Sequence, residues 1–217
     1  MQPSRLEAYN DILVLDASVV INLSASDIMA DILKAIDCQI LIPENVLSES
    51  LRNPATNAPI KAELENLNHQ GLLDFCTLDS VSVNDFLELT GAAAPNDLHD
   101  GEAATIAIAL GLKGRPVIDD RKAIRRCSEL YPSLEVAHTI DFFCHSLVGQ
   151  VLSLERLRQG LNRAFAHARM WLPNEYGNFV LKTIGNDNFY ECRSISGQLK
   201  KDLLGERMRV TYDQNSA

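Results

Sequence analysis

The sequence predicts an α/β fold in which helices cover both faces of a parallel sheet. Three short apolar runs, at residues 12–15, 39–42 and 116–118, are rich in β-branched residues and do not alternate with polar ones. This pattern is typical of strands that are buried on both faces. Helical patterns separate the runs, and regular alternation of strand and helix favours a parallel sheet.

The first half of the chain supplies two of these strands and the helices after them. Ser26 is positioned to cap a helix that has Ile28, Ile32 and Ile36 along one side. Pro43 marks the start of a helix after the second strand. The other elements expected here are a helix from Pro59 to Gly71, an edge strand over residues 72–78, a short helix over 82–89 and a loop over 91–97.

The second half begins with a helix over residues 102–112 that is apolar on nearly all sides and is therefore expected to be buried. The remaining elements expected are a third strand over 116–118, a helix over 122–130, a fourth core strand over 134–137, and two helices over 140–151 and 154–168. Residues 173–217 are polar and rich in Asn and Gly, which predicts a tail that ends in a strand at 207–212.

Length and charge suggest one domain with an extension. The chain has 217 residues, and we assign 10–150 to the main domain and 151–217 to a C-terminal helix and tail. The net charge is −9, but residues 151–217 are net +3, with 10 Lys and Arg against 7 Asp and Glu. This balance argues against coating of nucleic acid by bulk attraction, but it allows a local acidic site.

Cysteine and histidine usage gives no sign of a zinc or dithiol site. The five cysteines include no CxxC pair, and the five histidines form neither an HExxH motif nor a cluster with metal-ligand spacing. The N-terminus has acidic residues where a signal peptide needs an apolar core, and no apolar run approaches the roughly 18–20 residues of a membrane span. We therefore expect a soluble cytoplasmic protein with reduced thiols and no membrane contact.

Acidic side chains recur near the ends of the predicted strands. Asp16 follows the first strand, Asp119 and Asp120 follow the third, Glu102 opens a helix after a loop, and Glu49 lies in the helix after the second strand. The carboxyl ends of parallel strands meet at one edge of a sheet, where ligands bind. The sequence therefore predicts that these carboxylates gather there.

Clustered carboxylates repel one another, and a hard divalent cation such as Mg²⁺ or Mn²⁺ relieves that repulsion. Such ions can activate water for phosphodiester hydrolysis. A structural role remains open for each acid taken alone. Asp16 and Asp120 can be N-caps, Asp100 and Glu102 can complement a helix dipole, and the Ser18 hydroxyl can be a cap.

Four segments resemble, in order, the motifs of PIN-domain nucleases. They are LVLDASVVINL (13–23), IPENVLSESL (42–51), LHDGEAATIAIALGLKG (98–114) and PVIDDRKAIR (116–125). Together they resemble the branch that has Gly-Glu in the third motif and paired aspartates in the fourth, over about residues 10–140. In that branch a Gly-Thr turn commonly follows the last core strand, where this chain has His138-Thr139.

The resemblance implies a three-layer α/β/α PIN-like fold with a central parallel sheet of four to five strands. It also implies a hydrolase, a Mg²⁺- or Mn²⁺-dependent endoribonuclease. Many relatives are toxins that a small antitoxin protein holds inactive, so the implied partners are RNA and an antitoxin. A homodimer is left open.

Carried over by position, the resemblance assigns roles to the acids. Asp16, Glu102 and Asp120 would be catalytic metal ligands, and Glu49 and Asp119 would contact the metal directly or through water. Two further residues would support the site: Ser18 would orient Asp16 or a water, and Asp100 is a lesser candidate.

Basic residues after the fourth motif are candidates for RNA contacts, and Arg121 and Arg125 are the preferred ones because the metal motif positions them. Aromatic residues make up only 6% of the chain, which does not indicate a base-stacking platform. Trp171 and Phe179 are accordingly expected in the core or in an interface.

Two other functions remain open. The chain can be a non-catalytic PIN-like binding or regulatory subunit that acts through its C-terminal extension, with residues 207–212 adding a strand to a sheet edge. It can also be a phosphatase with an Asp nucleophile, although such enzymes usually have a second Asp where Ser18 stands. No GxxxxGK[ST] or GxGxxG motif supports nucleotide binding.

Overall fold

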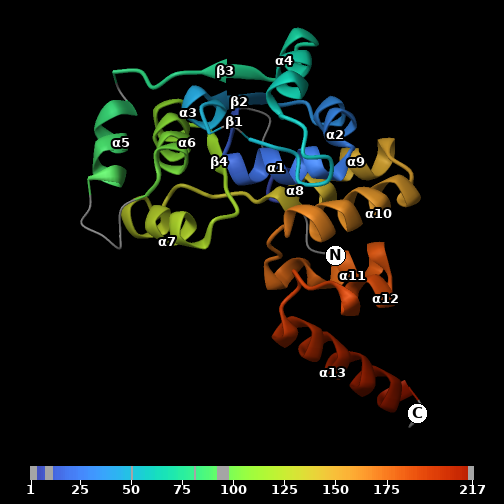
Figure 1. The fold of residues 1–217 in the computed structure, drawn as a ribbon. Coiled ribbons are helices and arrows are strands. Elements are labelled where there is room, and N and C mark those ends of the chain that lie inside the picture. Colours follow the sequence, from blue (N-terminus) through green and yellow to red (C-terminus); the bar gives the residue numbers. More distant parts are fainter. Residues whose placement is uncertain (1–3, 8–11, 50, 81, 92–97, 215–217) are drawn as a thin grey trace.

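A computed structural model describes residues 4–7, 12–49, 51–80, 82–91 and 98–214, with side chains described as far as Gly205 (Figure 1). Its centre is a parallel sheet of four strands in the order β3-β2-β1-β4. The strands are β1 (Ile12–Leu15), β2 (Gln39–Pro43), β3 (Asp74–Cys76) and β4 (Arg115–Val117). The predicted α/β class and the predicted edge strand are confirmed.

Successive residues of β1 face opposite sides of the sheet. Leu13 and Leu15 join the main core cluster, whereas Val14 packs in a separate cluster with Ile108 and Ala109. The last two residues belong to the buried helix α6 (Asp100–Gly111), which covers one face. Helices α1 (Ala17–Ser26) and α10 (Leu154–Arg163) pack together on the main-core side, so the sheet is enclosed between two helical layers (Figure 1).

The other elements surround these layers. They are α2 (Met29–Ala35), α3 (Glu44–Leu47), α4 (Lys61–His69), α5 (Ser82–Thr90), α7 (Arg121–Leu130), α8 (Thr139–Cys144), α9 (Ser146–Val151), the π-helical η1 (Ala164–Ala168), the 3-10 helix η2 (Asn174–Tyr176), α11 (Gly177–Ile184), α12 (Asn186–Glu191) and α13 (Gly197–Gln214). The predicted helices at 59–71, 82–89, 102–112 and 122–130 correspond to α4, α5, α6 and α7. Most of the predicted loop at 91–97 lies outside the described residues.

The prediction that a helix begins at Ser26 is wrong. A buried helix, α1, directly follows Asp16 and ends at Ser26. The Ser26 hydroxyl donates to the Leu23 carbonyl at 2.6 Å and accepts from the Ile28 amide, so it closes α1 and turns the chain into α2. Three of the four polar residues of α1 are also buried, namely Asn22, Ser24 and Ser26, so no solvent-facing stripe marks it as a helix.

Two predictions around residues 134–151 are also wrong. The expected strand at 134–137 forms only a single bridge, between Val117 and Ala137. The expected helix at 140–151 is split into α8 and α9, because His145 has extended backbone and caps α9 by accepting from the Leu147 amide.

The polar tail predicted for residues 173–217 is wrong, because these residues form helices that pack on the core. Tyr176 and Phe189 are fully buried in the main cluster. The strand expected at 207–212 lies inside α13. Leu199 and Leu203, one helical turn apart, bury together near Gly177, so helical spacing positions the apolar residues of this segment.

A buried aspartate joins the N-terminal segment to this C-terminal region. Asp141 is 0% exposed and accepts hydrogen bonds from the Arg5 amide at 2.7 Å, the His138 amide at 2.9 Å and the Tyr176 hydroxyl at 2.6 Å. Three donors, two of them from distant segments, compensate for burial of the carboxylate. Asp141 therefore helps to hold residues 4–7 and 173–176 near the carboxyl edge of the sheet.

Candidate metal centre

Asp16 lies at the junction between β1 and α1 and is only 3% exposed. Its Oδ2 accepts from the Ser18 amide at 3.1 Å and from the Ser18 hydroxyl at 2.7 Å. Burial raises the pKa of Asp16, the hydrogen bonds from Ser18 oppose this shift, and the charge of Asp120 adds to it. The net direction is upward, so the folded protein disfavours the charged carboxylate at this position.

Asp120 lies at the matching junction between β4 and α7. Its Oδ1 caps α7 by accepting from the Lys122 amide at 2.8 Å and the Ala123 amide at 2.9 Å. Within the part of the chain that the structure describes, its Oδ2 accepts no hydrogen bond. The N-cap role and a ligand role are therefore compatible, because one oxygen serves the helix and the other is left for a cation.

Glu102 is in the first turn of α6 and forms a capping box, in which its Oε2 accepts from the His99 amide at 3.2 Å. Burial raises its pKa from 4.5 to about 7, and the charges of Asp120 and Asp16 contribute to the rise. Glu102 therefore shares an acidic environment with both strand-end aspartates, although it comes from a different segment of the chain.

Glu49 was expected within the helix after β2, but α3 ends at Leu47 and Glu49 lies just beyond it. The Glu49 carboxylate lies over Gly101, where any Cβ would collide with its Oε1. Partial burial of this carboxylate raises the pKa of Glu49, and the charges of Asp16 and Asp100 raise it further. The Gly-Glu pair of the third motif thus has a steric explanation, since Gly101 makes room for Glu49.

Asp119 differs from the other acids because donors occupy both of its oxygens. Its Oδ1 accepts from the Thr139 amide at 2.9 Å, and its Oδ2 accepts from the Thr139 hydroxyl at 2.6 Å and the Asn22 amide group at 2.7 Å. Burial raises the pKa of Asp119, and these hydrogen bonds oppose the shift. Asp119 thereby ties β4 to α1 and α8, and Asn22 and Thr139 are site residues that the sequence reasoning missed.

The two arginines expected to contact RNA occupy different surroundings. Arg121 is exposed and lines a cavity together with Asp119 and Asp120. Arg125, one turn later on α7, is also exposed and forms an ion pair with Glu129 at 3.7 Å. Of these two arginines, Arg121 alone borders the cavity that Asp119 and Asp120 line.

The donor set fits a hard divalent cation. Asp16, Glu49, Glu102 and Asp120 offer carboxylate oxygens, and electrostatic effects connect Asp16 with each of the other three. Among the residues that the structure describes, no three His, Cys, Asp or Glu side chains are close enough to form a ready metal cage. Mg²⁺ and Mn²⁺ suit such a site because they keep several waters and need only a few protein carboxylates.

A four-stranded parallel sheet with acids at its carboxyl edge is the architecture of a PIN-like α/β protein. The model of the DUF3368 family, described as a PIN domain, matches residues 12–186, and the chain belongs to this family of PIN domains. PIN domains are generally nucleases and typically bind divalent metals. A search of the curated proteins found no match to the sequence. No helix in the described ranges is both long enough and apolar enough to cross a membrane.

The raised pKa of Glu102 predicts a pH-dependent effect of Glu102→Gln on stability. The Glu102 carboxyl group keeps its proton up to a higher pH in the folded state than in the unfolded state. Ionisation of Glu102 therefore destabilises the metal-free protein, progressively between pH 4.5 and about 7 and fully above that. Glutamine keeps an acceptor for the capping box and carries no charge. We expect the variant to be more stable than wild type at pH 8 by about 1–3 kcal/mol, after allowance for solvent screening, and nearly equal at pH 4.5.

Urea denaturation in the presence of a chelator, at both pH values, measures this difference. Glu191→Gln is the matched control, because Glu191 is exposed and distant in sequence from the acidic edge. An equal effect of Glu102→Gln at the two pH values would contradict the electrostatic origin of the shift.

Proposed function

We propose that the protein is a Mg²⁺- or Mn²⁺-dependent endoribonuclease that hydrolyses RNA phosphodiester bonds. The observation that supports this proposal is the convergence of Asp16, Glu49, Glu102 and Asp120 at the carboxyl edge of the sheet, with each of Asp16, Glu49 and Glu102 shifted toward a higher pKa. A fold that keeps carboxylates together against their repulsion is suited to a cation, and membership of a PIN domain family favours a nuclease.

In this proposal, Asp16, Glu102 and Asp120 hold the cation, and Glu49 contacts it directly or through water. When bound, the cation supplies Lewis acidity for phosphodiester hydrolysis and stabilises the displaced oxygen. Ser18 fixes the rotamer of Asp16 through its two hydrogen bonds. The α7 amides fix Asp120 through Oδ1, and Oδ2 stays available. Asp119 acts as a positioning residue, because its own oxygens are occupied by Asn22 and Thr139.

The polyanionic substrate needs positive charge next to these acids. Arg121 is exposed and borders the same cavity as Asp120, so it is our leading candidate for a phosphate contact. Arg125 is a weaker candidate, because Glu129 competes for its charge. A cation bound at the acidic edge reduces the repulsion further.

We also propose, from the family resemblance, that the enzyme is the toxin of a toxin–antitoxin pair and that a small antitoxin protein inhibits it. The test is induced expression of the wild-type chain with and without the product of a neighbouring small reading frame. We expect growth arrest and RNA decay that the co-expressed product suppresses. Cleavage of RNA in vitro without growth arrest would contradict the toxin role and leave the nuclease role intact.

Asp16→Asn and Asp120→Asn are each expected to lower Mn²⁺-dependent cleavage of RNA by at least about 100-fold. Each substitution preserves size and the cap acceptor, and it removes a negative charge that the cation needs. The measurement is cleavage of a labelled RNA with Mn²⁺ and with a chelator, together with calorimetric titration of Mn²⁺.

Asp187→Asn, at an exposed position of α12, is the matched control and should cleave like wild type. Cleavage that survives both site substitutions would refute the site assignment. A folded wild-type protein that binds no Mn²⁺ would overturn the nuclease proposal in favour of the non-catalytic binding or regulatory module.

Gly101→Ala is expected to displace the Glu49 carboxylate, because the new methyl group would occupy its place. The neighbour is the end of a flexible side chain, so the fold should tolerate the change while the apparent affinity for Mn²⁺ in the cleavage assay falls about 10-fold. Gly149→Ala in α9 is the control, since its Cβ would meet nothing within 4 Å. Equal Mn²⁺ dependence of both variants and wild type would show that Glu49 does not support the site.

A further inference from the structure

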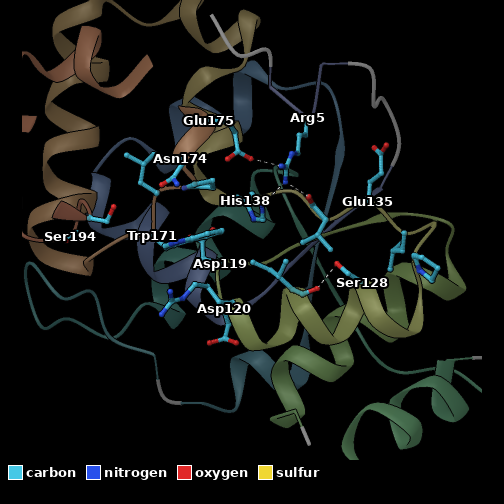
Figure 2. A pocket seen from close by; sticks show the side chains of 18 residues that line it. Arg5, Asp119, Asp120, Ser128, Glu135, His138, Trp171, Asn174, Glu175 and Ser194 are labelled. Carbon is cyan, nitrogen blue, oxygen red and sulfur yellow. Dashed lines mark hydrogen bonds and ion pairs between the residues drawn. The ribbon is translucent and has the colours of Figure 1, made fainter. Parts of the chain in front are cut away.

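A cavity of about 1120 Å³ opens beside the acidic edge of the sheet (Figure 2). Its walls come from segments that are distant in the sequence: Arg5 near the N-terminus, Asp119 and Asp120 after β4, the exposed side of α7, and residues 171–175 between η1 and α11. Its size exceeds that of a typical small-ligand pocket, so it has room for at least one nucleotide unit.

Trp171 supplies an aromatic wall of this cavity. It was expected in the core or in an interface, and Phe179 is indeed buried, but Trp171 is only partly buried and lines the cavity. Its neighbours Met170 and Leu172 are buried in the main core cluster and anchor the segment. The indole N–H donates to no acceptor within the part of the chain that the structure describes, so it is left for a ligand.

A network of fixed groups holds the Trp171 ring in place. The His138 ring meets it edge to face, with centroids 5.1 Å apart and an interplanar angle of 83°. Since a carbonyl can only accept, His138 Nδ1 donates to the Ile118 carbonyl at 2.8 Å, and Nε2 then accepts from Arg5 Nη1 at 2.6 Å. Arg5 is itself held by Glu175 at 2.8 Å. The aromatic wall is therefore preorganised, which favours stacking of a ligand on it.

The position of Trp171 relative to the acids indicates what it would bind. Trp171, His138 and Asp120 all line the one cavity, and Figure 2 shows their side chains around it. Arg121 borders the cavity at the Asp120 side and can neutralise a phosphate. An aromatic surface next to a positive charge and the proposed cleavage site is suited to bind an RNA strand with an unstacked base. A paired base inside a duplex cannot reach such a surface.

We infer that the Trp171 cavity is a nucleobase subsite, in which an unpaired base of single-stranded RNA stacks on the indole beside the bond to be cleaved. The inference rests on the proposed nuclease function and assigns to Trp171 the role of binding a base within it. The exposed Asn174 amide, which makes no side-chain hydrogen bond with any described residue, stands at the same wall and can read the base edge.

The sequence provides a specific probe, because Trp171 is the one tryptophan of the chain. Titration of wild-type protein with a short single-stranded oligoribonucleotide in the presence of a chelator should quench its fluorescence to saturation. An abasic oligonucleotide of the same length should quench little. Equal quenching by both would show backbone attraction alone and overturn the subsite.

Binding of a fluorescein-labelled oligoribonucleotide, followed by anisotropy, tests the side chain itself. Trp171→Ala should weaken binding by about ten- to a hundred-fold, whereas Trp171→Phe should stay within a few-fold of wild type because the ring is kept. Equal losses in both would indicate damage to the wall and would overturn stacking. Arg121→Ala and Arg125→Ala form a matched pair on α7, and the former should weaken binding more, since Arg121 borders the cavity.

Asp16→Asn separates this inference from the proposed function. This variant should lose cleavage and keep base-dependent quenching. The subsite would be refuted, and the nuclease proposal kept, by the following result: wild type cleaves RNA with metal but shows no base-dependent quenching, and Trp171→Ala cleaves normally. Base-dependent quenching without any cleavage by wild type would support the subsite and refute the nuclease.

Discussion

The repulsion between carboxylates at the carboxyl edge of the sheet is the constraint on which this structure depends. Asp16 and Asp120 both raise the pKa of Glu102, and Asp16 raises that of Glu49. Without a cation such an arrangement is unfavourable, so it persists only where the surrounding structure fixes its members. Backbone amides at the starts of α1, α6 and α7 provide that fixation, because Asp16, Glu102 and Asp120 each accept from an amide of the helix start that they occupy or precede.

The adjacent aspartates of the fourth motif show how one dipeptide serves two purposes. The Asp119 side chain is buried and surrounded by donors from Asn22 and Thr139, which locks the end of β4 against α1 and α8. The Asp120 side chain caps α7 through one oxygen and faces the cavity. The buried residue fixes the backbone from which the half-buried residue projects. Two acids that look alike in the sequence are therefore separated by their environments.

Local patterns in the sequence were sufficient for β1, β2 and β4 and for the acids that follow β1 and β4, but not for the expected strand at 134–137, which forms only a single bridge. The short apolar runs at the ends of which Asp16 and Asp119 lie are rich in β-branched residues and unbroken by polar ones, which marks them as buried strands. The helix α1 was missed because most of its polar residues, Asn22 among them, are buried and leave no polar stripe. The tail was mispredicted because burial of Tyr176 and Phe189 depends on packing partners from other parts of the chain. The same reason explains why the support of Asp119 by Asn22 and the steric fit of Glu49 over Gly101 were not predictable.

The N-terminal and C-terminal parts of the sequence meet at a single cavity. Residues 151–217 are net positive and the preceding residues strongly negative, which suggests two separate roles when charge alone is considered. In the structure, one core cluster extends from Leu6 to Leu203, and the segment with Trp171 and Glu175 lies beside Asp119 and Asp120. The Arg5 side chain bridges the two parts by contacting both His138 and Glu175. The C-terminal segment thus forms part of the cavity wall beside Asp119 and Asp120, and among the described residues it contributes Trp171 and Glu175 to that wall but no Lys or Arg. The positive charge at the cavity comes instead from Arg5 and Arg121, so the excess of basic residues after residue 150 is not what offsets the acids there.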